Sequence, residues 1–241
     1  MYRFKITTLS IMIGMILLSC TEQNIPLNPK SNDVIPFAES SEVATSKNVH
    51  RQISDVVSFA DLSVIVEDGA RLLRTHNNIQ MNINTVELTP HDTYTVWWVV
   101  FNNPDACEDG CSEPDLFNDE VGGSVLYAAG HVIGATDKGN FAGSLRAGDL
   151  SGCQPPWDAF DLTLIGGEGE MDLCRDGLVD PEGSEVHLVV RTHGEKVPGM
   201  VNDQINTYAG ACTAESSFGA GNGPNECEDQ QAVVFLSPEA E

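Results

Sequence analysis

An eleven-residue stretch late in the chain carries the side chains that are best suited to chemistry. Residues 184–194 read SEVHLVVRTHG. Alternate side chains of a β-strand share a face, so four of them would lie together: Glu185, His187, Arg191 and His193. Neighbouring positions on one face are about 7 Å apart, so Glu185 and His187 could share a metal ion or a proton. His193 lies farther along and would join them only if the strand bends.

A third ligand for this pair would have to come from another strand. His131, in the strand-like segment 128–133 (AAGHVI), is the candidate. Together with Glu185, His187 and, after a bend, His193, it would form the divalent-metal site of a metal-binding protein or metal-dependent enzyme. The alternative is structural, because a strand histidine is more often a hydrogen-bonded residue of the core or its rim. Arg191 has a similar interpretation, as one member of a cross-strand charge pair.

Two segments share the spelling Asp-x-Cys-x-Asp-Gly, at 105–110 and 172–177. Carboxylates at this spacing before a glycine resemble the opening of a calcium loop. The twelfth position, however, holds Leu116 or Gly183 where a calcium loop needs glutamate, and a cysteine stands at the third. Both segments are therefore predicted to be turns that a disulfide holds.

Trp157 lies between Pro156 and Asp158, in a segment rich in turn-forming residues. An exposed tryptophan on a rigid loop could stack on a sugar, which makes a carbohydrate-binding module a second alternative function. A single tryptophan is a small platform, and buried aromatic rings stabilise loops. We therefore favour packing of Trp157 beneath its own loop.

Periodicity indicates many short strands. Ile79, Met81 and Ile83 alternate with polar residues, as in a strand with one buried face. Residues 94–101 (YTVWWVVF) are apolar on both faces and predict a central strand covered on both sides. Further strands are expected within 62–66, 124–133, 141–145, 160–165, 184–192 and 232–236, and short helices near 115–119 and 201–208. This pattern favours an all-β fold, a single β-sandwich-like domain with disulfide-closed loops, over the alternative of a barrel.

The first twenty residues have the form of an export signal. Arg3 and Lys5 precede an apolar run from Leu9 to Leu18, which is about half the length that a membrane-spanning helix needs. The run ends in Leu-Ser-Cys, and residues 1–20 thereby resemble the lipobox signal of bacterial lipoproteins. That resemblance implies cleavage after residue 19, a lipid on Cys20, and a place in the cell envelope, at the outer membrane if the source has two membranes. Segments 94–107 and 185–194 also resemble an uncharacterised group of secreted bacterial proteins, which implies no activity.

Export also determines how the cysteines are interpreted. Without Cys20, six remain, an even number that predicts disulfides in an oxidising compartment. Six cysteines allow fifteen pairings. The simplest is sequential: Cys107 with Cys111, Cys153 with Cys174, and Cys212 with Cys227.

The net charge of the chain limits which partners it can bind. Removing residues 1–19 leaves ten basic side chains against thirty-six acidic ones, a formal charge near −26. Such a chain repels phosphate backbones and anionic lipids, so we expect no nucleic-acid partner and membrane contact only through the lipid. Residues 20–49 are polar and rich in proline and serine, which predicts a flexible tether before a domain at 50–241.

No nucleophile elbow, zinc-protease helix motif, phosphate loop or dinucleotide fingerprint is present. An enzyme is therefore not favoured, although a carboxylate pair of a glycosidase would be invisible in so acidic a chain. The leading hypothesis is an envelope or surface lipoprotein that binds a ligand or supports structure and needs no cofactor. An envelope protein or a glycan is the expected kind of partner.

We expect Cys20→Ser to release the protein from membranes, because the lipid is its main predicted membrane contact. Ultracentrifugation of cell lysates, with a Thr21→Ser variant as control, would measure this. Sedimentation of the Cys20→Ser protein with membranes would contradict the predicted anchor.

Overall fold

The computed structural model describes residues 49–107 and 110–238. The predicted signal peptide (1–19), the lipidation site Cys20 and the tether (20–49), apart from Val49, lie outside these residues. Among the residues described, no helix has the length and apolar character that crossing a membrane requires.

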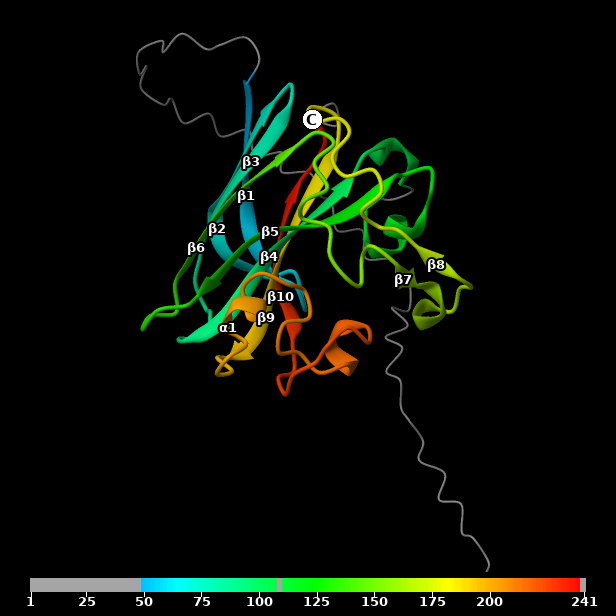
Figure 1. Ribbon diagram of the computed structural model, residues 1–241. Helices are drawn as coiled ribbons and strands as arrows, with labels where there is room; N and C mark the ends of the chain where they lie inside the picture. Colours follow the sequence, from blue (N-terminus) through cyan, green and yellow to red (C-terminus); the bar gives the residue numbers. More distant parts are fainter. Residues whose placement is uncertain (1–48, 108–109, 239–241) are drawn as a thin grey trace, which may run out of the picture. The chain divides into compact units, whose positions relative to one another are not determined.

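Eight antiparallel strands form one sheet in the order β5-β4-β9-β10-β1-β2-β3-β6 (Figure 1). Their bounds are β1 Val49–Ser58, β2 Val64–Thr75, β3 Asn78–Thr85, β4 Asp92–Phe101, β5 Gly123–Val132, β6 Gly139–Arg146, β9 Glu185–Glu195 and β10 Glu228–Phe235. Two short strands, β7 (Phe160–Asp161) and β8 (Glu170–Met171), form a separate hairpin. The prediction of an all-β fold with disulfide-closed loops is confirmed.

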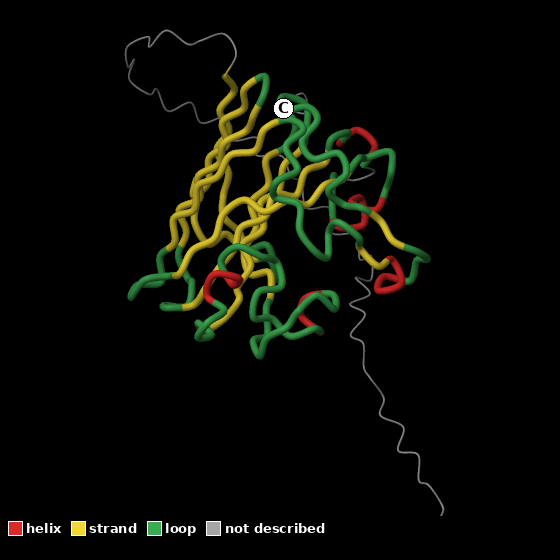
Figure 2. The backbone as a smooth tube through the Cα atoms, in the orientation of Figure 1, coloured by secondary structure: helices red, strands yellow, loops and turns green. Residues whose placement is uncertain are grey.

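The sheet wraps around a core until its two end strands approach each other. A Cβ atom on Gly143 of β6 would lie 3.0 Å from the carbonyl oxygen of Ala128 in β5, so the ends nearly meet. The face turned toward this core, called the inner face below, carries Trp98 of β4, Leu188 of β9 and Met81 of β3, all buried. One continuous sheet therefore supplies both layers of the sandwich-like fold (Figure 2).

Strand β4 is covered on both sides, as its sequence predicts. Only Val99 among residues 93–101 is less than fully buried. Trp97 and Trp98 point to opposite faces and are both buried. The outer face, which carries Trp97, Val99 and Phe101, must therefore be covered by something other than the sheet.

Three cover segments lie against this outer face, and each contains one disulfide. The first consists of the described residues of 102–122 (102–107 and 110–122) and holds Cys107–Cys111, residues 147–184 hold Cys153–Cys174, and residues 196–227 hold Cys212–Cys227. The sequential pairing is confirmed. Besides the short strands β7 and β8, the described residues of these segments contain only short turns of helix: η1 (Pro104–Ala106), η2 (Glu113–Phe117), η3 (Leu162–Ile165), α1 (Val201–Gln204) and η4 (Glu215–Ser217).

The cover segments also protect the free edge of the sheet. Backbone N–H groups of Val125 and Tyr127 in β5 donate to the carbonyls of Leu173 and Gly152 at 2.7 and 2.8 Å. Unpaired edge groups would otherwise invite aggregation. At Gly130 the approach is so close that a Cβ atom would lie 1.7 Å from the Ile205 carbonyl oxygen, so only glycine fits.

Several predicted elements differ from the structure. Residues 160–165 form only the two-residue strand β7 and then turn into η3, because Leu162–Ile165 have no partner strand. The strand expected at 62–66 begins at Val64 and continues to Thr75, and β1 was not predicted. Expected helices near 115–119 and 201–208 are the 3-10 helix η2 and the single turn α1.

Removing the Cys212–Cys227 disulfide should destabilise the domain by about 3 kcal/mol, because it closes the longer loop, while removing Cys107–Cys111 should cost about 2 kcal/mol. The sequence separations are 15 and 4 residues. Urea denaturation of the two double-alanine variants measures both values. An unchanged free energy of unfolding for the Cys212→Ala/Cys227→Ala protein would contradict this role.

Candidate functional site

A pocket of about 290 Å³ lies between the outer face of the sheet and the cover segments. Eight of its fifteen lining residues are aromatic, so its walls are mainly ring faces and edges. All three cover segments contribute: Glu113, Leu116 and Phe117 from the first, Trp157 and Phe160 from the second, and Tyr208 and Phe218 from the third. The pocket therefore forms only where the three cover segments come together over the sheet.

Aromatic contacts join the three segments to one another and to the sheet. The ring of Phe160 lies 5.4 Å from that of Phe117 and 5.3 Å from that of Phe218. Tyr208 contacts Trp157 edge-on at 4.7 Å and Trp97 of β4 at 5.3 Å. Such edge-to-face pairs stabilise by about 1 kcal/mol each beyond burial, and they hold the pocket walls in place.

The floor of the pocket consists of two central strands. Val99, His187 and Val189 are only half-buried there, although all other residues of 93–101 in β4 and 185–193 in β9 are buried. Val99 stands opposite His187 in the register. These three half-buried side chains mark the place where a bound molecule could contact the sheet.

His187 is held by Glu185 at the pocket floor. Its Nε2 lies 2.6 Å from Oε1 of Glu185, with the side chains 17% and 8% exposed. A carboxylate accepts, so Nε2 donates and Nδ1 keeps a lone pair when the ring is neutral. No described residue bonds Nδ1, which is therefore available to a ligand. The ring of Phe101, 4.9 Å away, supports the imidazole.

Two further carboxylates belong to the lining. Asp229 of β10 accepts from Nη1 of Arg191 at 2.9 Å, which confirms the cross-strand charge pair. The guanidinium of Arg191 also lies 4.1 Å from the centre of the Tyr208 ring and donates to the carbonyls of Tyr208 and Ser216. Glu113, at the start of η2, is exposed.

His193 lies on the same face but is buried beneath the third cover segment. Its Nδ1 lies 3.0 Å from the Gly210 carbonyl, which can only accept, so Nδ1 carries the hydrogen. Nε2 then accepts from the hydroxyl of Thr95 at 2.8 Å, and that oxygen accepts from Nε1 of Trp97. This chain of hydrogen bonds orients a pocket-lining tryptophan.

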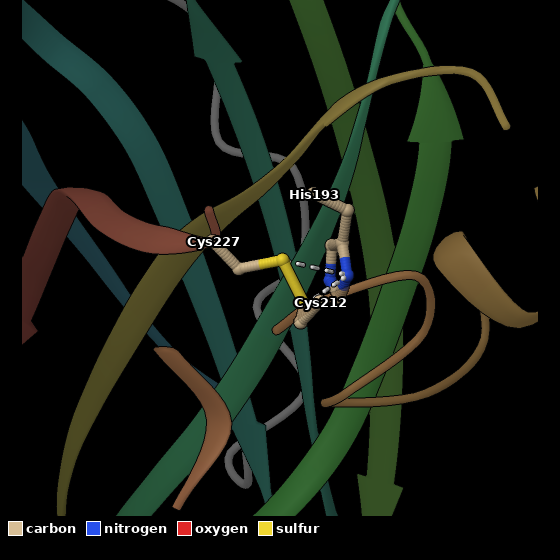
Figure 3. Close-up of side chains that lie close together, drawn as sticks. All are labelled: His193, Cys212 and Cys227. Carbon is tan, nitrogen blue, oxygen red and sulfur yellow. Dashed lines mark hydrogen bonds between the residues drawn. A yellow bond between two sulfur atoms is a disulfide. The ribbon is translucent and has the colours of Figure 1, made fainter. Parts of the chain in front are cut away.

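The Cys212–Cys227 disulfide lies directly beside the His193 ring (Figure 3). Burial lowers the pKa of His193 to about 4, opposed by the hydrogen bond to Gly210 and helped by the nearby charge of Arg191. His193 is therefore neutral in the folded protein near neutral pH and has a structural role.

The predicted metal ligands do not gather. His131 stands opposite Tyr94, whose side chain belongs to the inner face, and is exposed at the end of the sheet, whereas His187 lies on the outer face. Within 49–107 and 110–238, the groups of three or more close ligand atoms are His193 with Cys212 and Cys227, and Asp172 with Cys153 and Cys174. Both contain a disulfide. The structure brings together only Glu185 and His187 of the predicted set.

Trp157 packs inside the protein and is not an exposed platform. It is 8% exposed and stacks on Phe160 with the two planes at 7°, so one ring face is occupied. This geometry agrees with the predicted packing of Trp157 beneath its own loop, while the side chain still lines the pocket. The segment 172–177 is a turn, with Gly177 at a φ of +56° and the Asp172 carboxylate accepting from the Cys174 N–H. Segment 105–110 lies partly outside the described residues.

The sequence did not indicate most of the pocket. Tyr208, Phe218, Phe160 and Phe117 come from irregular segments without a period that could align them. The available signal was the doubly apolar strand β4, whose outer face required a cover rich in apolar side chains.

His193 should make stability depend on pH. The unfolded chain binds the proton near the ordinary value of 6.5 but the folded chain only near 4, so protonation favours unfolding as the pH falls between these values. Between about pH 7 and about pH 5, this effect should lower the free energy of unfolding by about 2 kcal/mol, given the folded-state pKa of about 4.

Urea denaturation of the wild type and His193→Gln at both pH values measures this contribution. In His193→Gln, this change in the free energy of unfolding between the two pH values should disappear. In His131→Gln, which alters an exposed histidine, it should remain. Equal pH dependence in all three proteins would contradict the assignment to His193.

The pocket combines aromatic walls, an oriented imidazole and two carboxylates, and such apolar cavities with few polar groups are typical of small-molecule sites. Comparison of the chain with protein-family models, curated proteins and solved structures found no match. We therefore infer its function from the geometry and chemistry of the pocket.

Proposed function

We propose that this protein is a non-enzymatic binding protein of the cell envelope, anchored by a lipid on Cys20, which holds a small aromatic or apolar molecule in its outer-face pocket. The observation that carries the proposal is a cavity of about 290 Å³ whose lining is mostly aromatic. Burial of an apolar ligand against such walls supplies most of the affinity, and a few polar groups orient it.

The construction of the walls supports a binding role. Rings from three segments meet around one cavity, and each segment is constrained internally by its own disulfide. A preorganised pocket loses less conformational entropy when a ligand enters. Three half-buried floor residues would become fully covered by an occupant: Val99, His187 and Val189.

The surroundings of Trp157 make glycan stacking a weaker proposal. A sugar needs an open ring face, and Phe160 covers one face of this tryptophan. The acidic surface supports the expectation that nucleic acids are not partners.

Filling the pocket with a large side chain should weaken ligand binding. We expect the neutral probe 1-naphthalenemethanol to bind the purified full chain in a saturable manner by calorimetry. Val189→Trp, which places a large ring on the pocket floor, should weaken this binding about tenfold or more.

Val49→Trp is the matched control, because Val49 is exposed at the far end of β1 and does not line the pocket. It should bind the probe like the wild type. If the wild type shows no saturable binding, or if Val189→Trp binds equally well, the pocket is not a ligand site.

A further inference from the structure

The polar groups of the pocket have one electrostatic character. Glu113, Asp229 and His187 line it, and no lysine or arginine is among its described lining residues. Asp229 is paired with Arg191, but Glu113 has no cationic partner within the described residues. An anionic ligand would be repelled by the unpaired carboxylate of Glu113, whereas a cation would be attracted to it.

The same field acts on a buried phenol at the pocket wall. Burial, first of all, raises the pKa of Tyr208, and the charges of Asp229 and Glu113 raise it further, while Arg191 lowers it. The charges of both carboxylates are therefore felt at this pocket-lining ring, where Arg191 opposes them. The strongly acidic chain adds a long-range attraction for cations.

The hydrogen-bonding groups of the pocket floor also favour a cationic ligand over an anionic one. Nε2 of His187, a pocket-lining residue, donates to Glu185, so Nδ1 is the acceptor of the neutral ring and has no hydrogen-bond partner among the described residues. A carboxylate is an acceptor as well, so the site calls for a ligand that donates. The aromatic rings complement a positive charge, since a cation is attracted to the face of tryptophan or tyrosine.

We propose that the pocket binds a protonated amine carried on an aromatic or compact apolar group, with the ring system between the aromatic walls and an N–H donating to Nδ1 of His187. This inference rests on the proposed binding function and specifies its ligand class. Glu113 attracts the ammonium group, and the apolar part covers Val99 and Val189 on the pocket floor.

A series of probes with one ring system tests the charge preference. Calorimetry on the full chain near neutral pH would compare 1-naphthylmethylamine, a cation, with the neutral 1-naphthalenemethanol and the anionic 1-naphthoate. The amine should bind about tenfold more tightly than the alcohol, and the carboxylate most weakly. A trimethylammonium analogue, which has no N–H, should bind more weakly than the amine, and equal binding would overturn the contact with His187.

Glu113→Gln should reduce amine affinity about threefold and leave the alcohol unchanged, as expected for one exposed charge. Glu67→Gln is the matched control, because Glu67 is an exposed residue of β2 outside the pocket. It should leave amine binding unchanged, which separates a local effect from that of net charge.

The outcomes distinguish the two proposals. If the alcohol binds and Val189→Trp blocks it, but the amine binds no better, the pocket is a ligand site and the amine preference is wrong. If neither probe binds the wild type, the binding function itself fails. If Glu67→Gln weakens amine binding as much as Glu113→Gln does, the attraction belongs to the whole surface and not to this site.

Discussion

The domain depends on one constraint, which is that β4 is apolar on both faces. Its inner face contributes Trp98 to the core that the sheet encloses, and its outer face carries Trp97 and Phe101. An apolar outer face in water would promote aggregation, and the chain has no long helix among its described residues to cover it. Irregular segments must therefore cover it, and such segments order only at a cost in conformational entropy.

Disulfides and aromatic contacts offset that cost. Each of the three cover segments has its own disulfide, and rings from all three meet over the sheet. Because irregular segments do not interdigitate with a sheet as completely as a second sheet would, the cover leaves a cavity above Val99, His187 and Val189. The feature that protects the sheet thus also creates the candidate site.

Four polar residues on one face of β9 have different roles because different neighbours surround them. His187 lines the pocket and is bonded to the buried Glu185, Arg191 is bonded to Asp229, and His193 is enclosed beside a disulfide. Only the first pair combines orientation with access. A shared strand face is therefore not sufficient to make a shared site.

The sequence by itself determined the strand periodicity, the doubly covered β4 and the shared face of Glu185 and His187, because these follow from the two-residue period of a strand. It allowed fifteen disulfide pairings, and the structure selected the sequential one. The sequence also left open whether His131 would approach His187. Only the tertiary structure decided that they lie on opposite faces, and that Tyr208, Phe160 and Phe218 converge on one cavity. Convergence depends on where irregular segments cross the sheet, and local periodicity carries no information about such long-range contacts.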